Sequence, residues 1–115
     1  MSPPTTPLFV KTHDFNLWLF ERTARFPKRL RHSYTHRLET LALDFEQTLI
    51  IANSSREQAR LARLREADAT LACLRTLMRY AYDFETISVR QLEFSARQMD
   101  ELGRLLGAWI KGSGR

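Results

Sequence analysis

The middle of this sequence has neither glycine nor proline. Among its 115 residues, glycine occurs only at positions 103, 107, 112 and 114, and proline only at positions 3, 4, 7 and 27, so residues 28–102 lack both. These two residue types disfavour helix interiors most strongly. Their absence, together with the lack of any alternating strand pattern, predicts long helices joined by very short connections.

Cysteine and long apolar runs are also scarce. Cys73 is the single cysteine, which excludes an intrachain disulfide and is typical of a cytoplasmic protein. Uncharged apolar runs such as Thr48–Ala52 are much shorter than a membrane span, and Ser2–Pro7 lacks the basic and apolar regions of a secretory signal. We therefore expect a cytoplasmic protein that does not enter a membrane.

Positive charge exceeds negative charge. The chain has 18 lysines and arginines against 13 acidic residues, a net charge of +5 and a pI near 10.0. Only three of the cations are lysines, and arginine binds phosphate through two parallel hydrogen bonds and stacks on bases. A polyanion is the expected partner, nucleic acid in preference to an anionic membrane surface. A GC-rich genome is the alternative explanation of the arginine content.

The positive charge is concentrated between Arg22 and Arg37, a stretch that contains no acidic residue. We call this stretch the basic segment. Its six cations are Arg22, Arg25, Lys28, Arg29, Arg31 and Arg37. A concentration of this kind is typical of a phosphate-binding surface, and an ordinary solvated face is the alternative.

Arginines elsewhere have acidic neighbours at helical spacing. An acid three or four positions away neutralises an arginine on a helix. On this criterion the neutralised arginines include Arg63, Arg79, Arg97 and Arg104, whereas the six cations of the basic segment, Arg56 and Arg75 are interpreted as uncompensated. The six cations are therefore the first candidates for phosphate contact, and Arg75 and Arg79 are the second.

Apolar periodicity predicts four helices, at about 13–25, 28–53, 56–83 and 89–111. Asp14 is expected in the first turn of the first helix, and Pro27 is expected to end or kink it. Ser55 with Gln58 and Ser88 with Gln91 have the spacing of capping boxes. Residues 1–11 are expected to be a disordered or extended leader and residues 112–115 a flexible tail. The fold prediction is an all-α, antiparallel up-down four-helix bundle over residues 12–111.

No motif points to catalysis or to a cofactor. Nucleophile elbows, Walker loops and dinucleotide fingerprints are missing from the sequence. His32, His36 and Glu39 have the spacing of metal ligands on one helix face, but the two histidines stand about 200° from the apolar stripe, whereas metal sites in bundles face inward. We expect a protein that is not an enzyme, with no catalytic residue, metal or cofactor.

Two apolar features bear on assembly. The first helical segment is apolar nearly all round, through Phe15, Leu17, Trp18, Leu19 and Phe20, and either core burial or an oligomer interface explains this. Gly103 and Gly107 predict the close approach of another helix, from the bundle itself or from a second subunit. Phe26 and Tyr34 are interpreted as core residues and not as base-stacking platforms, which favours contacts to the nucleic-acid backbone.

Three motifs together resemble one family of four-helix bundles. They are Phe26-Pro27-Lys28-Arg29, the stretch Leu77–Asp83 (LMRYAYD), and the stretch Leu102–Lys111 (LGRLLGAWIK). The family includes the ribosomal-RNA intervening-sequence proteins and the accessory variability determinants of diversity-generating retroelements, and the resemblance covers about Val10 to Lys111. The arginine-rich stretch Arg60–Asp68 is closer to the accessory proteins.

The resemblance implies a non-enzymatic homopentamer of bundles. Its basic surface would bind RNA or DNA and the reverse transcriptase of the retroelement, and would support mutagenic copying of the template RNA. The alternative is a structural bundle of the intervening-sequence type that meets an acidic protein partner or has an unknown role.

Overall fold

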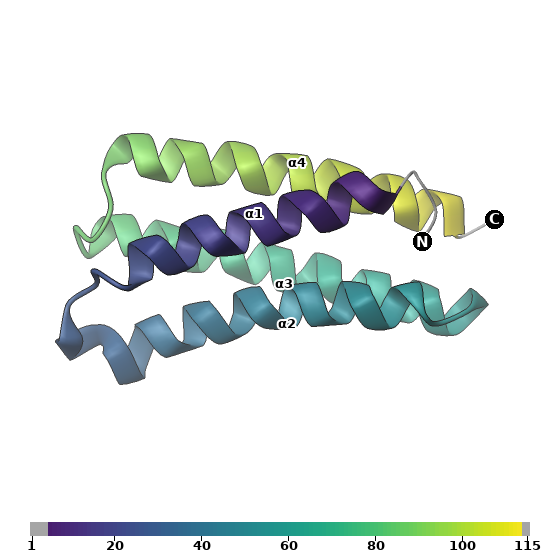
Figure 1. Ribbon diagram of the computed structural model, residues 1–115, viewed down its shortest axis with the longest axis horizontal. Coiled ribbons are helices and arrows are strands. Elements are labelled where there is room, and N and C mark those ends of the chain that lie inside the picture. Colours follow the sequence, from purple (N-terminus) through teal and green to yellow (C-terminus); the bar gives the residue numbers. More distant parts are fainter. Residues whose placement is uncertain (1–4, 114–115) are drawn as a thin grey trace.

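Four helices pack side by side in the computed structural model, which describes residues 5–113 (Figure 1). Consecutive helices run in opposite directions, and the molecule measures 45 × 25 × 19 Å. The helices are α1 (Thr6–Thr23), α2 (His36–Asn53), α3 (Glu57–Asp83) and α4 (Val89–Ser113); the 3₁₀ turn η2 (Lys28–Leu30) and the π-helical turn η3 (Arg31–Thr35) precede α2. The expected all-α four-helix bundle is confirmed.

The first helix begins earlier than expected. α1 starts at Thr6 and carries Pro7 in its first turn, where the missing N–H of proline is tolerated. The expected leader is wrong for residues 6–11, which are helical because Leu8 is buried in the core; residues 1–4 lie outside the described residues. Asp14 consequently lies in the third turn of α1, and not in the first. At the other end α4 includes Gly112 and Ser113 of the expected tail, and residues 114–115 lie outside the described residues.

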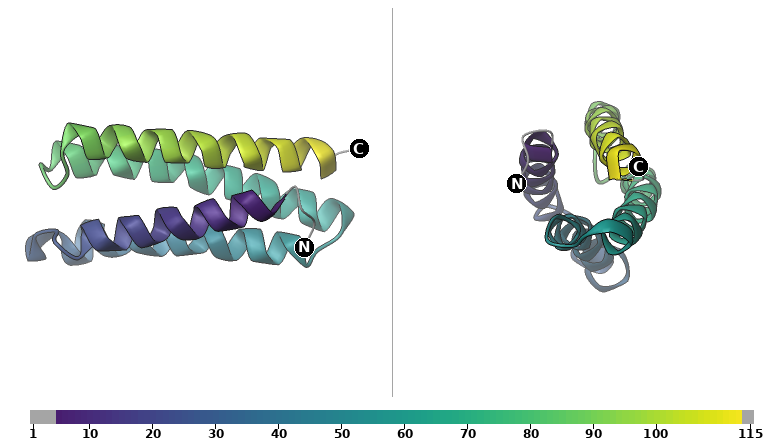
Figure 2. Two further views of the ribbon diagram at one scale, coloured as in Figure 1. Left: turned by 45° about the horizontal axis from the view of Figure 1, so that its top comes forward. Right: turned by 90° about the vertical axis from the view of Figure 1, so that its right-hand side faces the viewer.

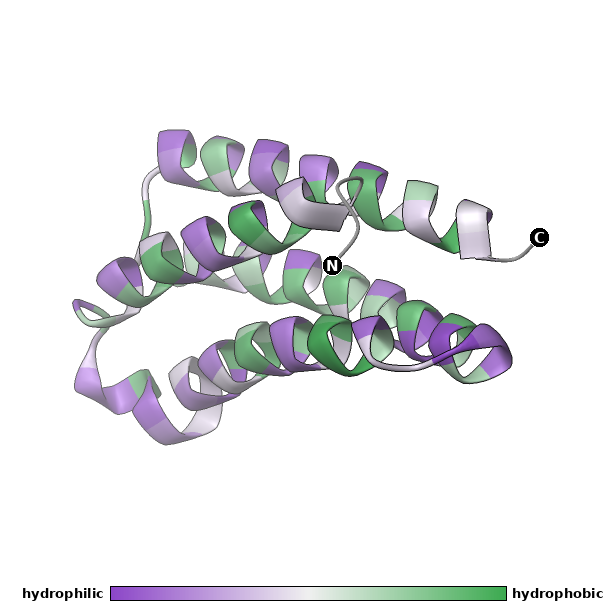
Figure 3. Ribbon diagram, turned by 45° about the vertical axis from the view of Figure 1, so that its right-hand side comes forward, coloured by the Kyte–Doolittle hydropathy of each residue, from purple (hydrophilic) through white to green (hydrophobic). Residues whose placement is uncertain are grey.

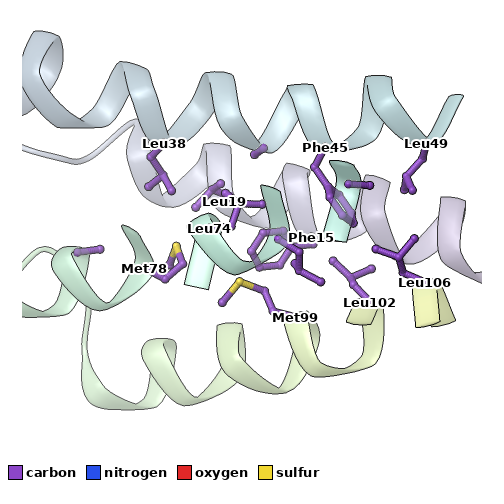
Figure 4. Packing of buried hydrophobic residues seen from close by; sticks show 14 of the residues in the cluster. Phe15, Leu19, Leu38, Phe45, Leu49, Leu74, Met78, Met99, Leu102 and Leu106 are labelled. Atoms are coloured by element: carbon purple, nitrogen blue, oxygen red, sulfur yellow. The ribbon is translucent and has the colours of Figure 1, made fainter. Parts of the chain in front are cut away.

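Apolar stripes from all four helices meet in one core (Figure 4). Side chains that are almost completely buried include Phe15, Leu19, Leu38, Phe45, Leu49, Leu64, Leu71, Leu74, Met78, Met99, Leu102 and Leu106. The predicted periodicities of the second, third and fourth helices supply most of this set. Burial of apolar area on this scale is the main stabilisation of such a bundle.

Aromatic pairs join α1 to α4, the first and last helices of the chain, which form the two ends of the U-shaped arrangement in the end-on view (Figure 2). The ring centroids of Trp18 and Phe94 are 5.0 Å apart, and those of Phe9 and Trp109 are 6.1 Å apart. The guanidinium of Arg60 also lies 6.0 Å from the Trp109 ring. The large apolar surface of Trp109 is therefore covered within the chain.

The connection between α1 and α2 differs from a simple helix break. α1 ends at Thr23, four residues before Pro27, and α-helical geometry returns only at His36. The expectation of one continuous helix from residue 28 is wrong, because the chain passes through η2 and η3 first. Tyr34 anchors η3: its ring contacts Phe84 with centroids 5.2 Å apart, and its hydroxyl donates a hydrogen bond to the carbonyl of Leu77.

Only one of the two expected capping boxes forms. The Gln91 N–H donates to Ser88 Oγ at 3.1 Å and the Ser88 N–H donates to Gln91 Oε1 at 2.8 Å, so this box is confirmed. The box expected at Ser55 is wrong, because its hydroxyl donates back to the Ile51 carbonyl of α2 at 2.7 Å. Arg56 takes the N-cap position of α3 instead, with an extended backbone and no side-chain cap.

Candidate nucleic-acid interface

The basic segment wraps around one end of the bundle. Hydrophilic residues predominate at this connection between α1 and α2, which lies at the same end as the turn between α3 and α4 (Figures 1 and 3). Its six cations are spread over five consecutive segments: Arg22 in the last turn of α1, Arg25 in the following turn, Lys28 and Arg29 in η2, Arg31 in η3 and Arg37 in the first turn of α2. The tight connection therefore gathers charges that are up to 15 residues apart in sequence at one end.

These cations are open to solvent and lack anionic partners. All are exposed except Arg22, which is half-buried with its guanidinium 5.7 Å from the Trp18 ring. Within residues 5–113 none of the six forms an ion pair or a side-chain hydrogen bond. Arg25 does have an acid, Glu21, four positions before it, but α1 ends at Thr23 and the two side chains form no ion pair. Six positive charges thus remain uncompensated at this end.

Arginines outside the basic segment behave differently. The helical pairs Arg63–Glu66, Arg79–Asp83 and Arg104–Glu101 form, with closest N···O distances of 3.1, 3.5 and 2.5 Å, as their spacing predicts. The hydrogen bond from Arg104 lowers the pKa of Glu101 and raises the pKa of Arg104 itself. Among the four expected pairings, that of Arg97 has no ion pair in the described part of the chain.

The second-ranked candidates are both engaged. The interpretation of Arg75 as uncompensated is wrong: its guanidinium contacts Asp100 of α4 at 2.5 Å and donates to the Met99 carbonyl at 3.1 Å. A rule based on spacing within one helix does not detect a partner on another helix. Gly103 makes room for this contact, because a Cβ at that position would lie 2.9 Å from Arg75 Nη2. Gly107 by contrast faces open space.

Phe26 and Tyr34 belong to the core, as expected. They are 8% and 6% exposed and stack with ring centroids 6.4 Å apart. Burial raises the pKa of Tyr34 well above its ordinary value. Neither ring is therefore available to stack on a base.

A pocket that the sequence did not reveal lies within the basic segment. It has a volume of about 330 Å³ and is lined by residues of both sides of the connection, among them Thr23, Arg31, Thr35 and Glu39. Thr23 Oγ1 donates to Glu39 Oε2 at 2.5 Å, whereas Thr35 Oγ1 is buried and has no hydrogen-bond partner among residues 5–113. An unpaired buried hydroxyl costs about 1–3 kcal/mol. Neither the charge pattern nor the spacing of apolar residues predicted this pocket, because both threonines are neutral and lie outside the predicted apolar stripes.

An exposed apolar strip runs along α1 and α2. Val10 and Leu17 on α1 and Leu43 and Ile50 on α2 are each about half exposed, and the two members of each pair are seven residues apart. Leu17 and Leu43 also line a shared groove with Phe20. We call these five residues the apolar strip. The apolar first segment is thus divided: Phe15 and Leu19 lie in the core, whereas Leu17 and Phe20 lie in the strip.

Fold and charge together define a class of protein, a four-helix bundle with an uncompensated basic end. None of the helices within residues 5–113 is long and apolar enough to cross a membrane. The sequence model of the bAvd-like family matches residues 8–113, and the chain belongs to this family. No curated protein matches the chain.

Proposed function

We propose that this protein is a non-enzymatic accessory factor of a diversity-generating retroelement, which binds nucleic acid through the basic segment. The observation that carries the proposal is the contrast between two sets of arginines. Four of the eight arginines on α3 and α4 form ion pairs with acids, whereas none of the six cations of the basic segment has a carboxylate partner among the described residues. Membership of the bAvd-like family supports the accessory role.

A salt-dependent binding assay tests this proposal. Each phosphate neutralised on a single strand contributes about −0.7 to the slope of log K against log salt concentration. The double variant Arg25→Glu/Arg29→Glu should weaken binding to RNA and DNA and make the slope shallower by about 1.4, with the helical signal unchanged. The variant Arg56→Glu/Arg65→Glu changes the net charge equally at the other end of the bundle and should have a much smaller effect.

Two results would contradict the assignment. Equal affinities for the two double variants would remove the basic segment from the interface. Wild-type protein that binds neither unrelated RNA nor unrelated DNA would favour the alternative, a structural bundle of the intervening-sequence type with an acidic protein partner. A gene for reverse transcriptase beside this one, with a pair of near-identical repeats, would support the retroelement, and a location within ribosomal-RNA genes would support the alternative.

Binding of the cognate reverse transcriptase is part of the same proposal. A retroelement copies its template RNA in a complex that holds both enzyme and RNA, and an accessory bundle with one basic end can contact both. Co-purification of the tagged protein with the reverse transcriptase of the same locus, after nuclease treatment, tests a direct contact. Loss of the enzyme from the complex on nuclease treatment would instead show that RNA alone connects the two.

We also propose that the bundle forms a homo-oligomer, a pentamer by family resemblance, through the apolar strip. Its members at seven-residue spacing on two antiparallel helices offer a continuous seam to a second copy. Sedimentation equilibrium should give about five copies for the wild type and a smaller assembly for Leu17→Glu/Leu43→Glu. Val89→Glu, a change at an apolar residue 52% exposed on α4, is the control. Equal masses for all three proteins would exclude the strip.

A further inference from the structure

The pocket at the junction of α1 and α2 has the size of a small-ligand site. Its volume of about 330 Å³ lies at the lower end of the range of about 300–1,000 Å³ that is usual for such pockets. Phe26 and Pro27 form part of its wall, and Arg31, Thr35 and Glu39 bring polar groups to it. It lies inside the basic segment, so a ligand that carries phosphate meets this pocket at the positive end of the molecule.

Three of the polar lining residues follow one another from η3 into α2. Arg31, Thr35 and Glu39 stand at intervals of four residues, which places them on one side of successive turns. The interval from Thr35 to Glu39 advances about 6 Å along the α-helix. A ligand that lies along the pocket therefore meets a cation, a hydroxyl and a carboxylate in that order.

The hydroxyl of Thr35 is exceptional in its surroundings. Thr12 and Thr70 donate to the carbonyl four residues before them, at 2.7 and 3.0 Å, as hydroxyls on α-helices commonly do. Thr35 lies in the π turn, where the Arg31 carbonyl accepts from the His36 N–H, and its own hydroxyl has no partner although the residue is only 7% exposed. Helical threonine occupies two χ1 rotamers. A ligand on this wall requires a change of rotamer to reach the buried Thr35 Oγ1 and supply the missing hydrogen bond.

The carboxylate of Glu39 excludes a plain phosphate site. Its Oε2 accepts from Thr23, and its Oε1 has no hydrogen bond within the described residues, so one acceptor remains for a ligand. A carboxylate repels phosphate but accepts a hydrogen bond from a sugar hydroxyl. A cation for phosphate followed by an acceptor for a hydroxyl is the order in which a ribonucleotide presents its groups.

We propose that this pocket holds one ribonucleotide unit. Arg31 donates to its phosphate, Thr35 and Glu39 hydrogen-bond to its sugar, and the 2′-hydroxyl donates to Glu39 Oε1. Phe26 and Pro27 pack against the ribose. The proposal rests on the proposed function, because it selects RNA from the polyanions that the basic segment attracts; the 2′-hydroxyl is the group by which a protein distinguishes RNA from DNA.

The test compares oligo(A) with oligo(dA) of equal length at fixed salt. The wild type should bind oligo(A) about three- to tenfold more tightly, the usual worth of a hydrogen bond in a partly buried site. Glu39→Gln weakens the acceptor and removes a negative charge, so it should strengthen oligo(dA) binding and reduce the preference. Asp44→Asn removes an exposed charge from the same helix and should leave the preference unchanged.

Thr35→Val removes the hydroxyl and changes no charge. It should weaken oligo(A) binding about three- to tenfold, whereas Thr48→Val, at a buried threonine of α2, should not. Thermal unfolding of all variants checks that each one is folded. AMP and dAMP distinguish the source of the ligand: a preference for AMP indicates a free nucleotide, and a preference confined to the oligonucleotides indicates a unit of an RNA strand.

The two proposals fail in different ways. Equal affinity of the wild type for oligo(A) and oligo(dA), with no effect of Thr35→Val, overturns the ribonucleotide pocket and leaves the basic interface standing. Absence of binding to both oligonucleotides at low salt overturns the proposed function, and the pocket with it.

Discussion

Two glycines on the same helix should respond differently to the same substitution. Alanine is more favourable than glycine in a helix interior by about 1 kcal/mol. Gly107 is exposed, and a Cβ there meets no atom within 4 Å. We expect Gly107→Ala to raise the free energy of unfolding by about 0.5–1 kcal/mol, which raises Tm by about 4 °C for a chain of this length.

At Gly103 the same gain in helix propensity is opposed by the loss of contacts that Arg75 makes. The new Cβ would lie 2.9 Å from Arg75 Nη2, so the guanidinium must move away from the Met99 carbonyl and from Asp100. The lost hydrogen bond is worth about 1 kcal/mol and the ion pair about 0–1 kcal/mol, because its side chains are 41% and 71% exposed. The loss equals or exceeds the gain, and we expect Gly103→Ala to leave stability unchanged or to lower it by up to about 1 kcal/mol.

Urea denaturation followed by circular dichroism measures both changes, and a double-mutant cycle isolates the cause. In the Arg75→Ala background the guanidinium is gone, so Gly103→Ala should recover its gain of about 1 kcal/mol. Equal stabilisation by Gly103→Ala and Gly107→Ala in the wild type would refute the reasoning. A Gly103→Ala effect that is the same with and without Arg75 would refute it as well.

Three further changes test other parts of the bundle. Glu85 follows α3 with a positive φ of 62°, in a Schellman turn in which the Thr86 N–H donates to the Ala81 carbonyl. Because glycine adopts a positive φ without strain, Glu85→Gly should stabilise the protein by about 0.5–1 kcal/mol, measured by thermal unfolding. Burial raises the pKa of the Tyr34 hydroxyl above its ordinary value of 10.0, so just above pH 10 only the unfolded chain loses the hydroxyl proton. The free energy of unfolding should therefore fall there by about 1.4 kcal/mol per pH unit. In Tyr34→Phe this part of the alkaline loss should disappear, at a cost of about 0.5–1.5 kcal/mol near neutral pH; an unchanged slope would contradict the assignment. Arg60 donates to the Ala52 and Asn53 carbonyls at 3.0 and 3.3 Å and contacts the Trp109 ring. Arg60→Ala should therefore lower the free energy of unfolding by about 1–2 kcal/mol, measured by urea denaturation. An unchanged free energy would mean that solvent replaces these contacts.

The spacing of apolar residues was sufficient to predict the fold, because residues at helical spacing are the ones that become buried. Leu38, Phe45 and Leu49 stand at the spacing of one helix face, and all three are buried. The same local logic was sufficient for ion pairs within a helix, such as Arg63 with Glu66. It was insufficient at Ser55, because the competing carbonyl of Ile51 depends on where α2 ends and how the chain turns.

By itself, the sequence determined four amphipathic helices, their order and the concentration of cations between Arg22 and Arg37, because period and charge are properties of neighbouring residues. Only the tertiary structure decided which cations remain free: Asp100 of α4 neutralises Arg75 of α3 from 25 positions away. It also decided that Thr23 and Glu39, 16 residues apart, meet across the connection, and that Thr35 lies in a π turn with its hydroxyl unpaired. Contacts of this kind depend on how helices pack against one another, which no local pattern specifies.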